Sequence, residues 1–180
     1  MVNDMLNKAL QFLSEHNEIA FATCEGDSPK LRIFQIMKRE GNVLYFATSA
    51  KKAVWRELKA NPNVEILAYA DNISVRCAGM VNFHVAEDVK HWIYDHNDVL
   101  SRLYTSYDQM EYFCLPIADL DYYDLSPTPP VNLHFDLMEG AVDKGYVGER
   151  FSKLHLAPLP ILQRGHAGVF FEIQTEGRVL

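Results

Sequence analysis

Two hydroxyl side chains followed, after one alanine, by two lysines form the stretch of this sequence that is best suited to chemistry. Thr48 and Ser49 end an alternating run, 43–48, that is typical of a strand, and Lys51 and Lys52 precede a segment with helical spacing. The pattern predicts a helix capped by Thr48 or Ser49, with both lysines in its first turn. A helix N-terminus disfavours cations, but hydroxyls, free amides and ammonium groups together suit a phosphate. The stretch indicates an anion site, although two solvated lysines explain it equally well.

A third cation lies on the preceding predicted strand, 30–37. Arg32 alternates there with large apolar residues, sharing one face with Phe34 and Ile36. A covered arginine needs an anionic partner. That partner is either a bound anion, which we favour, or a carboxylate in a structural ion pair.

Composition excludes several classes of function. With 180 residues, of which 48% are hydrophobic, the chain can bury the core of one domain. Its net charge of −7 argues against a nucleic-acid partner or an anionic membrane surface. We see neither a signal peptide nor a membrane-spanning run, and the three cysteines are widely spaced, so we expect a cytoplasmic protein with reduced thiols. The histidines lack paired spacing, so we expect no metal site. Of these histidines, we expect His134 and His166 to lie nearest to a ligand, because they occupy strand or glycine-loop positions.

The elements that must position these residues are mostly short strands. Turn residues separate them at short intervals, and a few helical segments lie between. We therefore predict an α+β, mainly β protein built on a small antiparallel barrel with peripheral helices. The expected helices are 5–13, 49–60, 86–94 and 99–107, and the expected strands are 19–24, 30–37, 43–48, 64–70, 73–85, 117–125, 131–135 and 169–173.

A change of composition follows residue 135. The segment 136–180 is rich in glycine and too short for a core of its own. We therefore predict a barrel domain, 1–135, and a C-terminal extension, 136–180, packed on that same domain.

Four motifs in a fixed order carry a resemblance to a known family. They are the strand 31–37, the strand-and-turn 44–52, the Asn-Pro segment 60–64 and the strand 75–79, which ends in glycine. This set resembles the pyridoxamine 5'-phosphate oxidase-like family, whose fold is an FMN-binding split β-barrel of antiparallel Greek-key type. The resemblance runs from the first helix to about residue 131.

The resemblance implies an FMN cofactor at the interface of a homodimer, with a set of residues to hold it. Arg32, Lys51 and Lys52 would contact the FMN phosphate, and Thr48 and Ser49 would donate hydrogen bonds to it. Ile33, Phe34 and Gln35 would run along the isoalloxazine ring, with backbone amides or the Gln35 amide reaching its polar edge. Ser74 occupies the place of a glutamine that the true oxidases use.

Departures from the family pattern limit the function that it implies. Besides Ser74, both tryptophans lie upstream of the tail, and its closing stretch 170–178 does not match the tryptophan-and-arginine signature of the true oxidases. We therefore do not expect pyridoxine-phosphate oxidase activity; the sequence resembles the shorter bacterial members. We expect an oxidoreductase that passes electrons between a reduced nicotinamide or another small-molecule donor and an acceptor. No side chain is indicated as catalytic. The alternative is a non-catalytic flavin- or ligand-binding protein with 136–180 as a lid.

Overall fold

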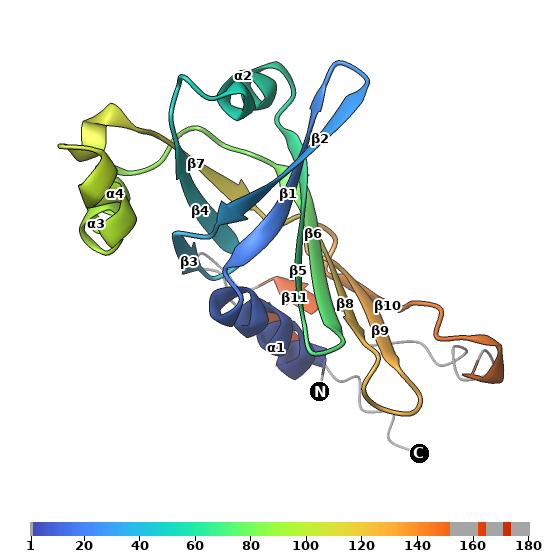
Figure 1. Cartoon of the computed structure of the whole chain (residues 1–180). Coiled ribbons are helices and arrows are strands. Elements are labelled where there is room, and N and C mark those ends of the chain that lie inside the picture. The colour runs from blue at the N-terminus through green and yellow to red at the C-terminus, as the bar shows by residue number, and fades with distance from the viewer. Residues whose placement is uncertain (1, 152–161, 165–170, 174–180) are drawn as a thin grey trace.

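Two antiparallel sheets form a split barrel, and the helices lie outside it (Figure 1). This computed structural model describes residues 2–151, 162–164 and 171–173. The predicted class, α+β and mainly β, is confirmed. The helices are α1 (Val2–Glu15), α2 (Ala53–Ala60), α3 (Glu87–Asp95), α4 (Asp98–Leu103) and the 3-10 turn η1 (Tyr107–Gln109). The strands are β1 (Glu18–Glu25), β2 (Ser28–Gln35), β3 (Lys38–Glu40), β4 (Val43–Thr48), β5 (Asn63–Ala70), β6 (Ile73–Met80), β7 (Glu111–Pro116), β8 (Asp119–Asp124), β9 (Val131–Asp136), β10 (Ala141–Lys144), β11 (Leu162–Arg164) and β12 (Phe171–Ile173).

The barrel closes where the chain passes from one sheet to the other. The larger sheet has the order β10-β9-β8-β6-β5-β1-β2, and the smaller sheet has the order β3-β4-β7. Between β2 and β3, the amide of Met37 donates to the carbonyl of Tyr45 at 2.9 Å. On the other side, Asn82 and Cys114 exchange two backbone hydrogen bonds of 2.8 Å. The two sheets therefore enclose one core.

The centre of that core is aromatic. Phe21, Phe34, Phe46 and Phe113 pack with ring centroids 4.9–6.1 Å apart, and they come from four strands of both sheets. Phe34 alternates with Leu31 and Ile33, which face outward, because successive side chains of a strand point to opposite faces. The predicted faces of this strand are confirmed.

The predicted strand 73–85 is too long, and the strand β7 was not predicted. β6 ends at Met80, close to the point where β7 crosses it. A Cβ on Gly79 would lie 2.6 Å from the carbonyl oxygen of Pro116. Gly79 therefore admits a neighbouring backbone that a side chain would exclude.

The segment around residue 135 is continuous in the larger sheet. β9 runs across the predicted boundary, and β10 pairs with it, Val142 opposite Phe135. The division into 1–135 and 136–180 stays a prediction. None of the helices in the described ranges is both long and apolar enough to cross a membrane.

Candidate functional site

The turn between β4 and α2 brings four of the predicted site residues together. The Ser49 hydroxyl accepts a hydrogen bond from the amide of Lys51 at 3.2 Å, and the Ser49 carbonyl accepts one from the amide of Lys52 at 3.0 Å. This serine turn uses up residues 49–52, so α2 starts only at Ala53, with Lys52 as an N-cap that forms no side-chain capping bond. The predicted caps, Thr48 or Ser49, are wrong, and the lysines precede the first helical turn.

Several groups in this turn suit an anion. The hydroxyl of Thr48 lies in a residue only 4% exposed and has no hydrogen-bond partner among the described residues. A buried hydroxyl without a partner is unfavourable. Lys51 and Lys52 are exposed, and neither forms an ion pair with a described residue. An orphaned hydroxyl, two free ammonium groups and an uncapped helix N-terminus fit a phosphate group.

Arg32 lies beneath α2 in a polar network. Its Nη2 lies 2.7 Å from Oε2 of Glu57, and its Nη1 donates to the Thr23 hydroxyl at 2.7 Å. The Thr23 hydroxyl in turn donates to the same Glu57 oxygen. The structural ion pair that we left open for Arg32 is therefore present, and a contact of Arg32 with phosphate stays a prediction.

The three residues after Arg32 point in different directions. Ile33 is exposed on the outer face, and the ring of Phe34 lies in the aromatic core, so only its backbone could run along a flavin. Gln35 is half-buried, and its Oε1 accepts a hydrogen bond from the Asn97 amide at 3.3 Å. Asn97 also caps α4 through the amides of residues 99 and 100.

Ser74 lies on β6, apart from the strand that carries the predicted site residues 32–35. It pairs with Tyr69 of β5 and Tyr123 of β8, on the same outer face as Ile33. Three strand spacings separate β6 from β2, which is roughly 14 Å at 4.8 Å per spacing. Within one chain, Ser74 therefore lies well away from β2, the strand that carries Arg32 and Gln35.

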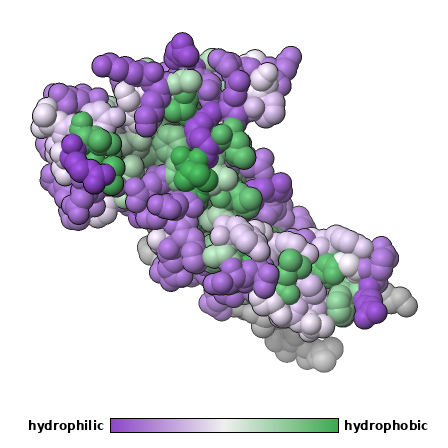
Figure 2. Space-filling view, viewed as in Figure 1, coloured by the Kyte–Doolittle hydropathy of each residue, from purple (hydrophilic) through white to green (hydrophobic). Residues whose placement is uncertain are grey.

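The outer face of the larger sheet carries an apolar patch. Leu31 and Ile33 of β2 and Leu67 and Tyr69 of β5 are exposed, with small alanines of β1 between them in the register. Figure 2 shows hydrophobic side chains gathered in this region of the molecule. Exposed apolar residues that cluster in this way are typical of an interaction surface.

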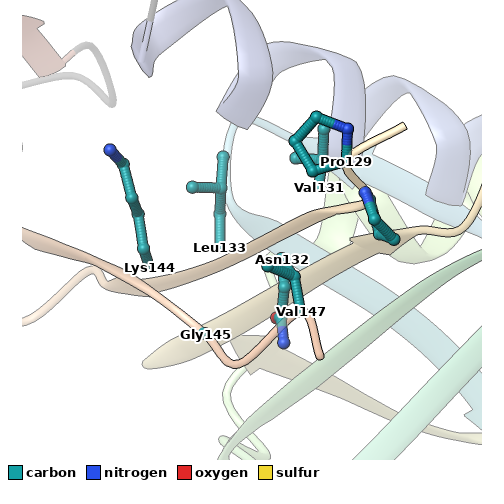
Figure 3. A pocket seen from close by; sticks show the side chains of 8 residues that line it. Pro129, Val131, Asn132, Leu133, Lys144, Gly145 and Val147 are labelled. Atoms are coloured by element: carbon teal, nitrogen blue, oxygen red, sulfur yellow. The ribbon is translucent and has the colours of Figure 1, made fainter. Parts of the chain in front are cut away.

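Two cavities lie elsewhere. A polar cavity of about 250 Å³ lies between Trp55 of α2, Phe83 and Tyr112. An apolar cavity of about 200 Å³ lies along the β9–β10 hairpin, where Leu133 and Lys144 extend from the same side (Figure 3). None of the predicted site residues lines either cavity.

The thiols and histidines of the described residues show little reactive chemistry. Burial raises the pKa of the Cys77 thiol, and burial also raises the pKa of Cys114, so both stay protonated at neutral pH. His134, which we considered closest to a ligand, has Nδ1 2.8 Å from Asp121. His166, the second such candidate, lies outside the described residues. No group of three or more potential ligands in the described ranges could hold a metal ion.

Sequence reasoning missed Glu57, Thr23 and Asn97. One signal for Glu57 was available: with Val54 and Leu58 it forms an i, i+3, i+4 set on the buried face of the helix. A carboxylate at such a position needs a cation, and Arg32 was the strand residue in want of an anion.

Comparison of the sequence with models of known protein families finds a match. A family model described as pyridoxamine 5'-phosphate oxidase matches residues 5–113. No curated protein sequence matches the chain.

Solved structures resemble the fold. A NimC/NimA family protein from Clostridium acetobutylicum has a TM-score of 0.62 and 25% identity, covering 73% of this chain and 92% of its own. A pyridoxamine 5'-phosphate oxidase-related, FMN-binding protein from Nostoc punctiforme has a TM-score of 0.60 and 15% identity, with 74% and 88% covered. PhzG from Burkholderia lata, in complex with tetrahydrophenazine-1-carboxylic acid, has a TM-score of 0.55 and 13% identity, with 74% and 85% covered.

Proposed function

Since the chain belongs to the pyridoxamine 5'-phosphate oxidase family, we propose that it binds FMN and acts as an oxidoreductase. The observation that carries the proposal is the lysine turn, which comprises residues 48–52. It combines the Thr48 hydroxyl with two lysines at a helix N-terminus, and these groups have no hydrogen-bond or ion-pair partner among the described residues. These groups match the charge and the acceptor oxygens of a phosphate.

The chain's own residues would hold the cofactor rather than react. Lys51 and Lys52 would neutralise the phosphate, and Thr48 would donate its hydroxyl to a phosphate oxygen. The outer edge of β2, from Arg32 to Gln35, offers backbone along which a planar ring can lie. FMN supplies the hydride chemistry when it is bound, between a reduced nicotinamide or another small-molecule donor and an acceptor.

A second copy of the chain would complete the site. The patch of Leu31, Ile33, Leu67 and Tyr69 lies beside the strand that we assign to the flavin, and a homodimer would cover it. Sedimentation equilibrium of the purified protein tests this part of the proposal. A monomer at micromolar concentration, with or without FMN, would contradict it.

The phosphate site is tested by changing Lys51→Ala together with Lys52→Ala. Losing two charge-assisted contacts should weaken FMN binding by about 2–4 kcal/mol, measured by quenching of flavin fluorescence. Riboflavin, which lacks the phosphate, should bind both proteins equally. The control is Lys90→Ala with Lys144→Ala, which removes the same charge from α3 and β10. Equal FMN affinity for the wild type and the Lys51/Lys52 variant would refute the site.

The oxidoreductase is tested separately on the FMN-loaded protein. Anaerobic addition of NADH or NADPH should bleach the visible absorbance of the bound flavin, and air should restore it. Bound flavin that no nicotinamide donor reduces would favour the non-catalytic binding protein instead.

A further inference from the structure

A buried carboxylate lies beside the proposed phosphate site without belonging to it. Glu57 is only 5% exposed, and Arg32 is the one cation with which it forms an ion pair among the described residues. Thr23, which is also buried, bonds to both. A buried charge is tolerated only when it is paired and hydrogen-bonded, as it is here.

The position of Glu57 on α2 sets its distance from the lysine turn. Glu57 follows Ala53, the first residue of the helix, by four positions. At 1.5 Å per residue, its backbone lies roughly 6 Å along the axis from the helix start. Its carboxylate and the Arg32 guanidinium therefore lie within about one Debye length of a phosphate bound at the turn.

The charges around the turn then match one phosphate. Arg32, Lys51 and Lys52 contribute +3 and Glu57 contributes −1, which leaves +2. A phosphate monoester carries about −1.5 to −2 at neutral pH. We infer that Glu57 sets the affinity of the proposed phosphate site: it positions Arg32 by ion pairing and cancels one positive charge, so that the site binds the phosphate less tightly than its three cations alone would. The inference rests on the proposed function.

Two properties of Glu57 can be separated by substitution. Glu57→Gln keeps an acceptor oxygen for Arg32 and Thr23 but removes the negative charge. The variant should bind FMN about tenfold more tightly, as expected for removing a negative charge within about one Debye length of a dianion. Riboflavin affinity should not change. If Glu57 had a purely structural role, Glu57→Gln would either weaken the binding of both FMN and riboflavin or leave both unchanged.

The experiment is a fluorescence titration of FMN and riboflavin at two salt concentrations. It compares the wild type, Glu57→Gln and the control Glu15→Gln, which removes the same charge from α1, at the opposite end of the barrel from α2 (Figure 1). Tighter FMN binding by Glu57→Gln, with a steeper salt dependence and unchanged riboflavin binding, supports the inference. Equal or weaker FMN binding by a folded Glu57→Gln overturns it.

A second variant covers the case in which Glu57→Gln does not fold. Arg32→Gln with Glu57→Gln replaces the buried ion pair by two amides and leaves the net charge of the site at +2. FMN affinity within about tenfold of the wild type supports charge matching, and a larger loss overturns it. If no variant and no wild type bind either flavin, the proposed function fails. If the Lys51/Lys52 substitutions weaken FMN binding but Glu57→Gln does not tighten it, only this inference fails.

Discussion

Two arginines on separate strands of one sheet form ion pairs in opposite environments. Arg32 on β2 faces inward, where its side chain is 24% exposed and its partner Glu57 is 5% exposed. Arg76 on β6 faces outward, where its side chain is 57% exposed and that of Asp121 is 26% exposed. Arg76 also lies 3.1 Å from Glu65, and Asp121 also contacts His134.

The difference shows that burial, rather than the number of contacts, decides how much such an ion pair contributes to the stability of the fold. The outer network has more members but is solvated, so each contact contributes little and salt screens it. The inner pair has few members, but neither charge can be left alone without a large desolvation cost. The inner pair therefore fastens α2 to the sheet, and the outer network mainly sets the charge of a surface.

Glu57→Ala gives the largest expected effect. It leaves the Arg32 guanidinium and the Thr23 hydroxyl without their acceptor and opens a small cavity. We expect a loss of about 3 kcal/mol in the free energy of unfolding, near the lower limit for breaking a buried pair because Arg32 is partly solvated. Urea denaturation followed by circular dichroism measures it. If the free energy of unfolding fell by less than about 1 kcal/mol, the Arg32–Glu57 pair would stabilise the protein no more than the exposed Arg76–Asp121 pair.

Gly79→Ala should have the next largest effect. Gly79 lies on β6, the strand that also carries Arg76, so the variant tests whether backbone packing stabilises this strand more than the Arg76 ion pairs do. The new methyl group would meet the Pro116 carbonyl and the Leu115 side chain, so β6 and β7 must separate. Overpacking of this kind should lower the free energy of unfolding by about 2 kcal/mol. An unchanged midpoint of urea denaturation would mean that the two strands move apart without cost.

Asp121→Asn should have the smallest effect. It removes the carboxylate from Arg76 and His134 on the exposed face, and we expect a loss of about 1 kcal/mol or less. The loss should shrink when salt is raised from about 0.05 M to 0.5 M, because the Debye length shortens. A loss as large as that of Glu57→Ala, unaffected by salt, would contradict the contrast between the two networks.

Much of the fold could be predicted from local pattern. Alternation along β2 placed Leu31 and Ile33 on one face and Phe34 on the other, and the structure keeps that division. β7 escaped prediction because residues 112–115 are all buried, so the strand has no alternation to detect. β10, four residues long, is too short to carry a pattern.

In the candidate site, too, the local features could be predicted from the sequence and the tertiary contacts could not. The lysine turn is contiguous in sequence, so its hydroxyls and cations could be found together. The contact between Arg32 and Glu57 joins residues 25 positions apart on a strand and a helix, and only the tertiary fold specifies it. The start of α2 was misplaced because Ser49 bonds within its own turn, a local alternative to capping.

The shortness of α2 has a consequence for how a ligand would meet the turn before it. A helix of eight residues is not stable alone in water, so α2 exists only while the buried Val54, Leu58 and Glu57 hold it on the sheet. Unwinding α2 would leave the buried Glu57 without its cation. The backbone amides of α2 should therefore exchange hydrogen only in openings that cost nearly as much free energy as global unfolding. The lysine turn would then be preorganised before any ligand arrives, and binding would not have to supply the entropy of folding it.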